Sequence, residues 1–302
     1  MNQVTIKNNF ITLTVLDYGA IIQKVILKNK DGVDTNVVVG LEEPSKYLTD
    51  NNCLGACIGR YAGRISNSSF QVNNTQYPIY SKNGVHLHGG KQGFNKRYWT
   101  IEQIYDGENP FVRLSYISKD MEEGYPGNLK TTVTYKLVGS SLFFIHKATT
   151  DKATPVNLTN HSYFNLDGAD KIDNHELRLS CPEYLETDEK LLPTGKIVSV
   201  KNSKYDFLQL KKIGEVRLDT PFVVDSSLKE HTMLASKKSG LSMEVITNQP
   251  GIVIYTPREF AAICFETQNF PDAPNQPNFP NSILQPGETY HNETEFKFSF
   301  VL

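Results

Sequence analysis

The sequence predicts an all-β fold, either a sandwich or a barrel. Three observations support this prediction: apolar and polar residues alternate with a period of two, Gly, Asn, Asp and Pro separate the alternating segments, and helical patterns are scarce. Many short strands with turns between them are typical of such folds, which often exceed about 200 residues as one unit. We therefore expect a single domain covering residues 1–302, with few short helices.

In the first half of the chain, strands are expected at 11–16, 24–27, 129–137 and 143–150. The alternation is clearest in 129–137, where one face carries Leu129, Thr131, Val133, Tyr135 and Leu137 and the other carries Lys and Thr. Helical turns are expected at 43–50, EPSKYLTD.

In the second half, strands are expected at 175–180, 241–246, 251–256, 262–266 and 295–302. The last of these places Phe296, Phe298 and Phe300 on one face. A second short helical segment is expected at 207–215, FLQLKKIGE.

Composition and charge argue against two classes of protein, those that bind nucleic acid and those that span a membrane. A net charge of −2 offers no basic surface for nucleic acid, and the apolar runs are far shorter than the roughly 18 residues of a membrane span. The N-terminus lacks signal-peptide features, and the four cysteines are interpreted as small buried side chains rather than ligands or disulfides. We expect a cytoplasmic protein without nucleic-acid or membrane partners.

Two histidines stand in NGVHLHGGKQGFNKRYW, residues 83–99. His86 and His88 share a face if the segment is a strand, so they are possible metal ligands. The ten residues after His88 contain neither an acid nor a Cys, which weighs against a metal. The alternatives are polar histidines beside a glycine turn, or a site where glycines let a ligand approach the backbone.

Three further segments carry polar side chains suited to a ligand. GRYAGRIS supplies Arg64, whose guanidinium has five fixed donors, although arginines on strands are usually surface charges. LTNHSYFNLDG supplies His161, the side-chain type best suited to proton transfer near neutral pH. RLDTPFVVD supplies Asp219, which is either a turn residue or a ligand contact.

The run ETQNFPDAPNQPNFP, residues 266–280, has a proline at every third position, as on one edge of a polyproline II helix. It follows a predicted strand that ends at Glu266, and another strand follows it. A docking strip is commoner in tails and linkers, so we favour a stiffened loop that holds Glu266 steady. Phe279 is a possible hydrophobic contact at the edge of a cleft, and the role of Asp272 stays open.

Together these residues favour a sugar site. The chain shows neither a serine nucleophile elbow nor a phosphate-binding glycine loop, and we expect no metal or other cofactor. Aromatic residues beside hydroxyl-binding groups suggest a neutral sugar, and a Glu with a His suggests a general base with a general acid.

The motifs resemble those of the aldose 1-epimerase family, the galactose mutarotases. The resemblance covers nearly the whole chain, from LTVLDYGAIIQKV through GRYAGRIS, HLHGGKQGFNKRYW, TNHSYFNLDG and LDTPFVVD to ETQNFPDAPNQPNFP and LQPGETY. TNHSYFNL and ETQNFPDAPNQPNFP are the most specific blocks. The resemblance implies a large β-sandwich, the galactose mutarotase-like supersandwich, with its site in a cleft across one sheet.

The resemblance also implies residue roles. Glu266 would be the catalytic base, His161 the catalytic acid, and His88 a group that positions the ring oxygen. Arg64 and Asp219 would bind sugar hydroxyls. One departure is Gly63, where many members have Asn, which affects the preference among sugars.

The expected substrate is a free aldohexose such as galactose or glucose, whose α and β anomers would interconvert by ring opening and closure. For this reaction we expect His161 to stay protonated near neutral pH beside a carboxylate. Alternatives are a hexose-6-phosphate mutarotase, for which Lys91, Lys96 and Arg97 supply nearby charge, a non-catalytic carbohydrate-binding β-sandwich, and a proline-strip adaptor. The protein is expected to be a monomer or a homodimer.

Overall fold

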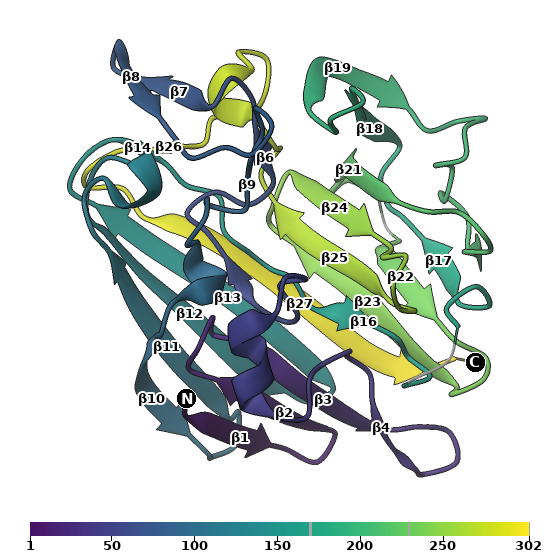
Figure 1. The fold of residues 1–302 in the computed structure, drawn as a ribbon. Coiled ribbons are helices and arrows are strands. Elements are labelled where there is room, and N and C mark those ends of the chain that lie inside the picture. Colours follow the sequence, from purple (N-terminus) through teal and green to yellow (C-terminus); the bar gives the residue numbers. More distant parts are fainter. Residues whose placement is uncertain (169–170, 229, 302) are drawn as a thin grey trace.

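Two large antiparallel sheets enclose most of the hydrophobic core (Figure 1). The structure is a computed structural model that describes residues 1–168, 171–228 and 230–301. The larger sheet has nine strands in the order β10 (Thr100–Tyr105), β11 (Phe111–Ser118), β12 (Leu129–Val138), β13 (Ser141–Thr150), β27 (Tyr290–Phe300), β23 (Leu241–Thr247), β22 (Thr232–Ala235), β17 (Glu176–Arg178) and β20 (Lys211–Lys212).

The second sheet carries the wall of the candidate site. Its six strands run in the order β16 (Tyr163–Phe164), β25 (Ile263–Gln268), β24 (Gly251–Tyr255), β21 (Asp219–Val223), β18 (Glu183–Thr187) and β19 (Pro193–Ser199). A four-stranded sheet at the N-terminus contains β1 (Gln3–Lys7), β2 (Ile11–Leu16), β3 (Ile22–Lys28) and β4 (Asp34–Asn36).

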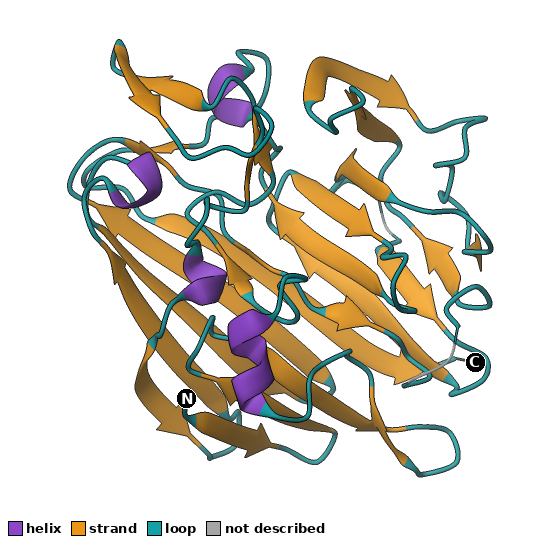
Figure 2. Cartoon of the chain, viewed as in Figure 1, coloured by secondary structure: helices purple, strands orange, loops and turns teal. Residues whose placement is uncertain are grey.

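The remaining elements are short, as Figure 2 shows. Four two-stranded pairs occur among the described residues: β5 (Cys57–Ile58) with β15 (Thr159–Asn160), β6 (Arg64–Ile65) with β9 (His86–Leu87), β7 (Ser69–Val72) with β8 (Thr75–Pro78), and β14 (Thr154–Pro155) with β26 (Ile283–Leu284). The 3-10 helices are η1 (Pro44–Thr49), η2 (Phe94–Lys96), η3 (Glu122–Gly124) and η4 (Ala273–Asn275).

Contacts between the two large sheets explain the alternation in the sequence. Phe164 of β16 stacks on Phe296 of β27 with ring centroids 5.2 Å apart, and the Thr267 and Thr294 hydroxyls hydrogen-bond at 2.6 Å. The predicted inward face of 129–137 is fully buried in β12. The predicted all-β sandwich is therefore confirmed.

The three phenylalanines predicted on one face, Phe296, Phe298 and Phe300, do lie on one face of β27. Phe296 and Phe298 are buried, while Phe300 is 56% exposed because it occupies the last position of the strand. Residue 302 of that predicted strand lies outside the described residues. The segment 207–215 forms no helix, because tertiary pairing uses its backbone: Lys211–Lys212 pair with β17, and the Phe207 carbonyl accepts the Leu179 N–H at 2.7 Å. The helical turns predicted at 43–50 are present as η1.

Candidate active site

A cavity of about 190 Å³ opens on the face of the six-stranded sheet that points away from the nine-stranded sheet. The residues that line it come from segments spread between positions 51 and 271: Asn51, Asn52, Cys53, Gly63, Arg64, Leu87, His88, His161, Tyr163, Leu191, Asp219, Pro221, Val253, Tyr255, Glu266, Gln268 and Pro271. Five of the six residues predicted to form a site are thus brought together.

Strand β25 places Glu266 in the cavity wall. Alternate residues of a strand face opposite sides, and Thr267 points to the nine-stranded sheet, so Glu266 and Gln268 point to the cavity. Glu266 is 3% exposed, and its Oε2 atom has no hydrogen-bond partner among the described residues. Burial raises the pKa of Glu266 to about 8, with the nearby Asp219 charge adding to the shift and Arg64 opposing it.

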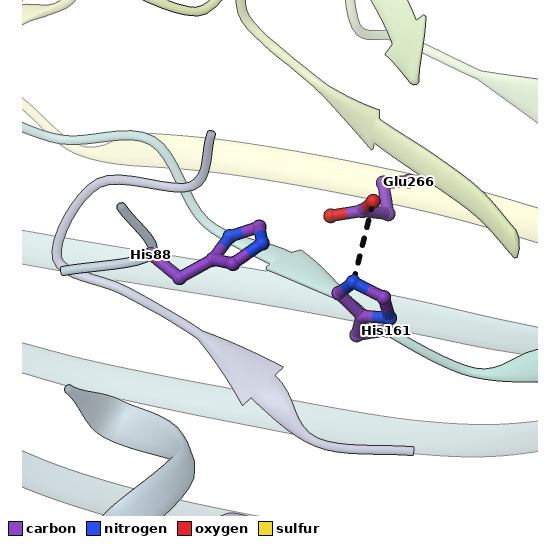
Figure 3. A group of neighbouring side chains, drawn as sticks. All are labelled: His88, His161 and Glu266. Atoms are coloured by element: carbon purple, nitrogen blue, oxygen red, sulfur yellow. Dashed lines mark ion pairs between the residues drawn. The ribbon is translucent and has the colours of Figure 1, made fainter. Parts of the chain in front are cut away.

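His161 directly follows β15 and is held by backbone hydrogen bonds to the two residues before β5. The His161 N–H donates to the Ala56 carbonyl, and the His161 carbonyl accepts the Gly55 N–H. Its side chain points at that of Glu266 (Figure 3), with Nε2 3.5 Å from Glu266 Oε1, and its Nδ1 lies 3.5 Å from Cys264 Sγ. The imidazole ring packs 4.9 Å from the Tyr163 ring.

The expectation that His161 stays protonated in the resting site is wrong. Burial lowers the pKa of His161 to about 4, because a buried imidazolium loses its hydration. Burial shifts the pKa of Glu266 in the opposite direction, so the resting pair is uncharged, with its proton on Glu266. The close contact becomes an ion pair only when that proton moves to His161.

His88 lies beside this pair, with its ring 5.4 Å from the His161 ring in an edge-to-face arrangement (Figure 3). The Gly63 N–H donates to His88 Nδ1 at 3.3 Å, so Nε2 carries the proton of the neutral ring. Burial lowers the pKa of His88 well below its usual value, and the charges of His161 and Arg64 add to this. At Gly89, which follows, a Cβ would stand 1.8 Å from the Gly59 carbonyl oxygen, so the turn requires glycine.

Arg64 of β6 and Asp219 of β21 both line the cavity and form an ion pair at 3.2 Å. Both side chains keep partial exposure, 22% and 29%, so their remaining donor and acceptor groups are accessible to a ligand. Gly63, just before Arg64, has φ of +81° and a Cβ position 3.1 Å from Pro271, so the cavity wall is tightly packed there.

The group of His88, His161 and Glu266 offers three possible metal ligand atoms within 4.8 Å of one another. The hydrogen bond that the Gly63 N–H donates to His88 makes this group unsuitable for a metal ion. It occupies the Nδ1 lone pair of His88 and leaves an N–H, not a lone pair, at Nε2. The arrangement favours a ligand that offers oxygen acceptors to His88.

Phe279 is not among the residues that line the cavity. It is 7% exposed and packs edge-on against Phe270, with ring centroids 5.2 Å apart, in a cluster with Leu185 and Ala273. Among the prolines of the run 266–280, Pro271 lines the cavity.

Asp272 binds the loop rather than the cavity. Its carboxylate is fully buried and accepts hydrogen bonds from the Ser66 N–H at 2.9 Å, Asn275 Nδ2 at 3.0 Å and Gln276 Nε2 at 3.2 Å. Its own N–H donates to the Arg64 carbonyl at 2.7 Å. The proline run is therefore tied to the strand that carries Arg64.

Sequence reasoning missed several lining residues, including Tyr163, Tyr255 and Gln268. For Gln268 a signal was present, because it lies two positions after Glu266 in a strand and so shares its face. Tyr255 gave no comparable signal, since its place depends on the pairing of β24 with β25.

Comparisons with known proteins agree with this arrangement. A family model described as aldose 1-epimerase matches residues 2–297. The galactose mutarotase of Homo sapiens is 37% identical over 97% of this chain and 93% of that protein, and the aldose 1-epimerase of Escherichia coli K12 is 33% identical over 98% and 94%.

Solved structures give the same result for the fold. The crystal structure of a GalM/aldose epimerase homologue from C. elegans matches with a TM-score of 0.94 and 30% identity, covering 100% of this chain and 99% of that one. Galactose 1-epimerase from Lactobacillus acidophilus NCFM matches with a TM-score of 0.90 and 28% identity, covering 99% and 95%.

Proposed function

The chain belongs to the aldose 1-epimerase family, and on that basis we propose how its cavity interconverts the α and β anomers of a free hexose. It is an isomerase with mutarotase activity. The observation that carries the residue assignment is the buried contact of 3.5 Å between His161 Nε2 and Glu266 Oε1. We assign Glu266 as the base that acts on the anomeric hydroxyl and His161 as the acid that acts on the ring oxygen.

Ring opening needs two proton transfers. A sugar that displaces water and donates hydroxyls to Glu266 favours the charged form of the pair, with the proton on His161. Glu266 then takes the proton of the anomeric hydroxyl, His161 gives its proton to the ring oxygen, and the bond between C1 and the ring oxygen breaks. The ring-opened aldehyde is left beside an uncharged pair.

That uncharged pair is the form that burial favours, so the cavity stabilises the ring-opened intermediate. Rotation about the C1–C2 bond presents the other face of the aldehyde. In closure, Glu266 returns its proton to the carbonyl oxygen while His161 removes the proton from the attacking hydroxyl. Each proton-transfer group of this kind typically contributes about 10²–10⁴-fold to the rate.

The other lining groups position the sugar. His88 presents its Nε2–H as a donor to an oxygen acceptor, and Arg64 and Asp219 offer groups to the hydroxyls. We propose that these three residues bind the ring and that Phe279 supports the loop behind it, since Phe279 lies in a hydrophobic cluster.

A hexose 6-phosphate is a poorer candidate substrate. Among the described lining residues Arg64 is the sole Lys or Arg, and it already pairs with Asp219. Arg97, near the glycine turn, pairs with Glu122 at 2.9 Å. Within the described lining, a phosphate dianion would meet two acids, Asp219 and Glu266, while the cation there is already paired.

A non-catalytic sugar-binding module would not need a desolvated carboxylate against a histidine. Enzyme added to freshly dissolved α-galactose, α-glucose and α-glucose 6-phosphate, followed by optical rotation, tests the assignment. We expect faster relaxation with the free sugars and little with the phosphate. Relaxation at the spontaneous rate with all three would contradict a catalytic role.

We further propose that residues 1–302 act as one catalytic domain, since the cavity uses residues from position 51 to position 271. A cytoplasmic location is supported by four free cysteines, three of them buried. The substrate is a small sugar, and either a monomer or a homodimer keeps the cavity complete, because one chain supplies all of its lining residues.

A further inference from the structure

Gln268 is a buried glutamine whose two amide ends have unequal surroundings. Its side chain lines the cavity, yet only 1% of the residue is exposed. The Nε2 atom donates to the backbone carbonyls of Ala62 at 3.4 Å and Asn269 at 3.1 Å. The Oε1 atom has no hydrogen-bond partner among the described residues.

The orientation of this amide is determined by its neighbours. Turning the amide over would place Oε1 against two carbonyl oxygens, which repel it and offer no proton. The nitrogen therefore stays on the backbone side, and the oxygen remains the free polar atom. A buried acceptor without a partner is costly, so native structures normally satisfy such groups with protein, water or ligand.

The position of Gln268 relative to Glu266 shows where a ligand would meet it. The two residues lie two positions apart on the same face of β25, so their side chains start about 6.6 Å apart along the strand. Within the part of the chain that the structure describes, each carries an oxygen without a hydrogen-bond partner, Glu266 Oε2 and Gln268 Oε1. This separation is comparable to the distance between hydroxyl oxygens on opposite sides of a pyranose ring.

We infer that Gln268 Oε1 accepts a hydrogen bond from a sugar hydroxyl on the side of the ring opposite the anomeric carbon, at C3, C4 or C6. The inference rests on the proposed function, because it places the anomeric hydroxyl at Glu266. Gln268 is thus a substrate-recognition residue. A sugar that lacks the matching hydroxyl leaves a buried acceptor unpaired.

The test measures kcat/KM by optical rotation, with the spontaneous rate subtracted, for galactose and its 2-, 3-, 4- and 6-deoxy analogues. We expect the wild-type protein to lose about 5- to 150-fold on the matching analogue, the range for one unpaired buried group. In Gln268→Met, which keeps the length but lacks the acceptor, galactose and that analogue should react within about threefold of each other.

Gln23 offers a matched control. It is also 1% exposed and donates its Nε2 to two backbone carbonyls, those of Leu41 and Glu42, but its Oε1 accepts the Gln3 Nε2 and it does not line the cavity. Gln23→Met removes the same chemical group at equal burial, so it should keep the wild-type pattern across the deoxy sugars.

Equal losses on every analogue in the wild-type protein and in Gln268→Met would overturn the inference. So would a Gln268→Met protein that has lost the discrimination between galactose and the 2-deoxy sugar. If Gln268→Met does not fold, the wild-type protein alone still tests the inference, because equal losses on the 2-, 3-, 4- and 6-deoxy sugars would overturn it. A wild-type protein that fails to accelerate galactose itself would instead refute the proposed function.

Discussion

His161 Nε2 and Glu266 Oε1 lie 3.5 Å apart in a wall where both residues are at most 5% exposed. Burial disfavours the charged form of each, which lowers the pKa of His161 to about 4 and raises that of Glu266 to about 8. Between these values the pair holds one proton, and moving it from one residue to the other changes no overall charge. Glu266 and His161 therefore act as one acid–base pair, in which the position of a single shared proton decides which residue is the acid.

The first prediction concerns pH. We expect kcat/KM to be level between about pH 4 and pH 8, to fall below as the pair gains a second proton, and to fall above as it loses its only one. Optical rotation at constant ionic strength measures this, with the spontaneous rate subtracted at each pH. A profile that rises steadily from pH 7 to pH 9 would be incompatible with a shared proton.

Removing the carboxylate should abolish most activity. Glu266→Gln keeps the size of the side chain but has no proton to exchange, so we expect kcat to fall by about 10²–10⁴-fold. Glu108, which is exposed, gives the matched control Glu108→Gln, expected to behave as wild type. Near-wild-type mutarotation by Glu266→Gln would show that another group is the base.

The same substitution should stabilise the protein in alkali. The pKa of Glu266 is about 8 in the folded state against 4.5 for an ordinary Glu, so the folded state holds the proton longer. The stabilisation that Glu266 contributes to the folded state is fully present below pH 4.5 and is lost as the pH rises to about 8. Glu266→Gln avoids that loss, so its Tm advantage should be larger at pH 9 than at pH 5.

Thermal unfolding at the two pH values measures the effect, with Glu108→Gln showing no pH-dependent difference from wild type. An advantage of Glu266→Gln that shrinks from pH 5 to pH 9 would mean that Glu266 is not held protonated by burial.

His146 in β13 should make the protein sensitive to acid. It is 1% exposed, neither ring nitrogen has a partner among the described residues, and burial lowers its pKa from 6.5 to about 3. The unfolded chain therefore binds a proton first, and stability is lost as pH falls from 6.5 towards 3. His146→Leu should raise the Tm and reduce its fall between pH 7 and pH 4.

The exposed His291 supplies the control His291→Gln, which should leave the acid sensitivity unchanged. Equal acid sensitivity in His146→Leu and wild type would show that His146 does not titrate during unfolding.

Asp272 should act on the substrate through the loop it holds. Asp272→Asn keeps the side-chain size and tolerates the left-handed backbone at φ of +60°, but it replaces an acceptor with a donor facing other donors. We expect a loss of about 1–3 kcal/mol in stability and a higher KM, because the loop is tied to Arg64. Asp31→Asn, on an exposed loop, is the control. An unchanged KM with a lowered Tm would limit Asp272 to a structural role.

Much of this architecture is readable in the sequence because period-two alternation reports which strand face is buried. The inward face of β12 follows it without exception. The helix predicted at 207–215 is wrong because its local helical pattern competes with pairing to β17, a partner that no local window contains. The position of Phe279 away from the cavity has a similar explanation. Its contact with the Phe270 ring exists only in the folded loop and has no signal in the local sequence.

Short motifs and local alternation are enough to identify the family, the strand pattern and the residue types at the site. The protonation of Glu266 and His161, and the lack of a partner for Gln268 Oε1 among the described residues, emerge only when the strands pack together. This is because desolvation and hydrogen-bond satisfaction depend on every group packed around an atom. Here those groups come from strands more than one hundred residues apart, as with His161 and Cys264.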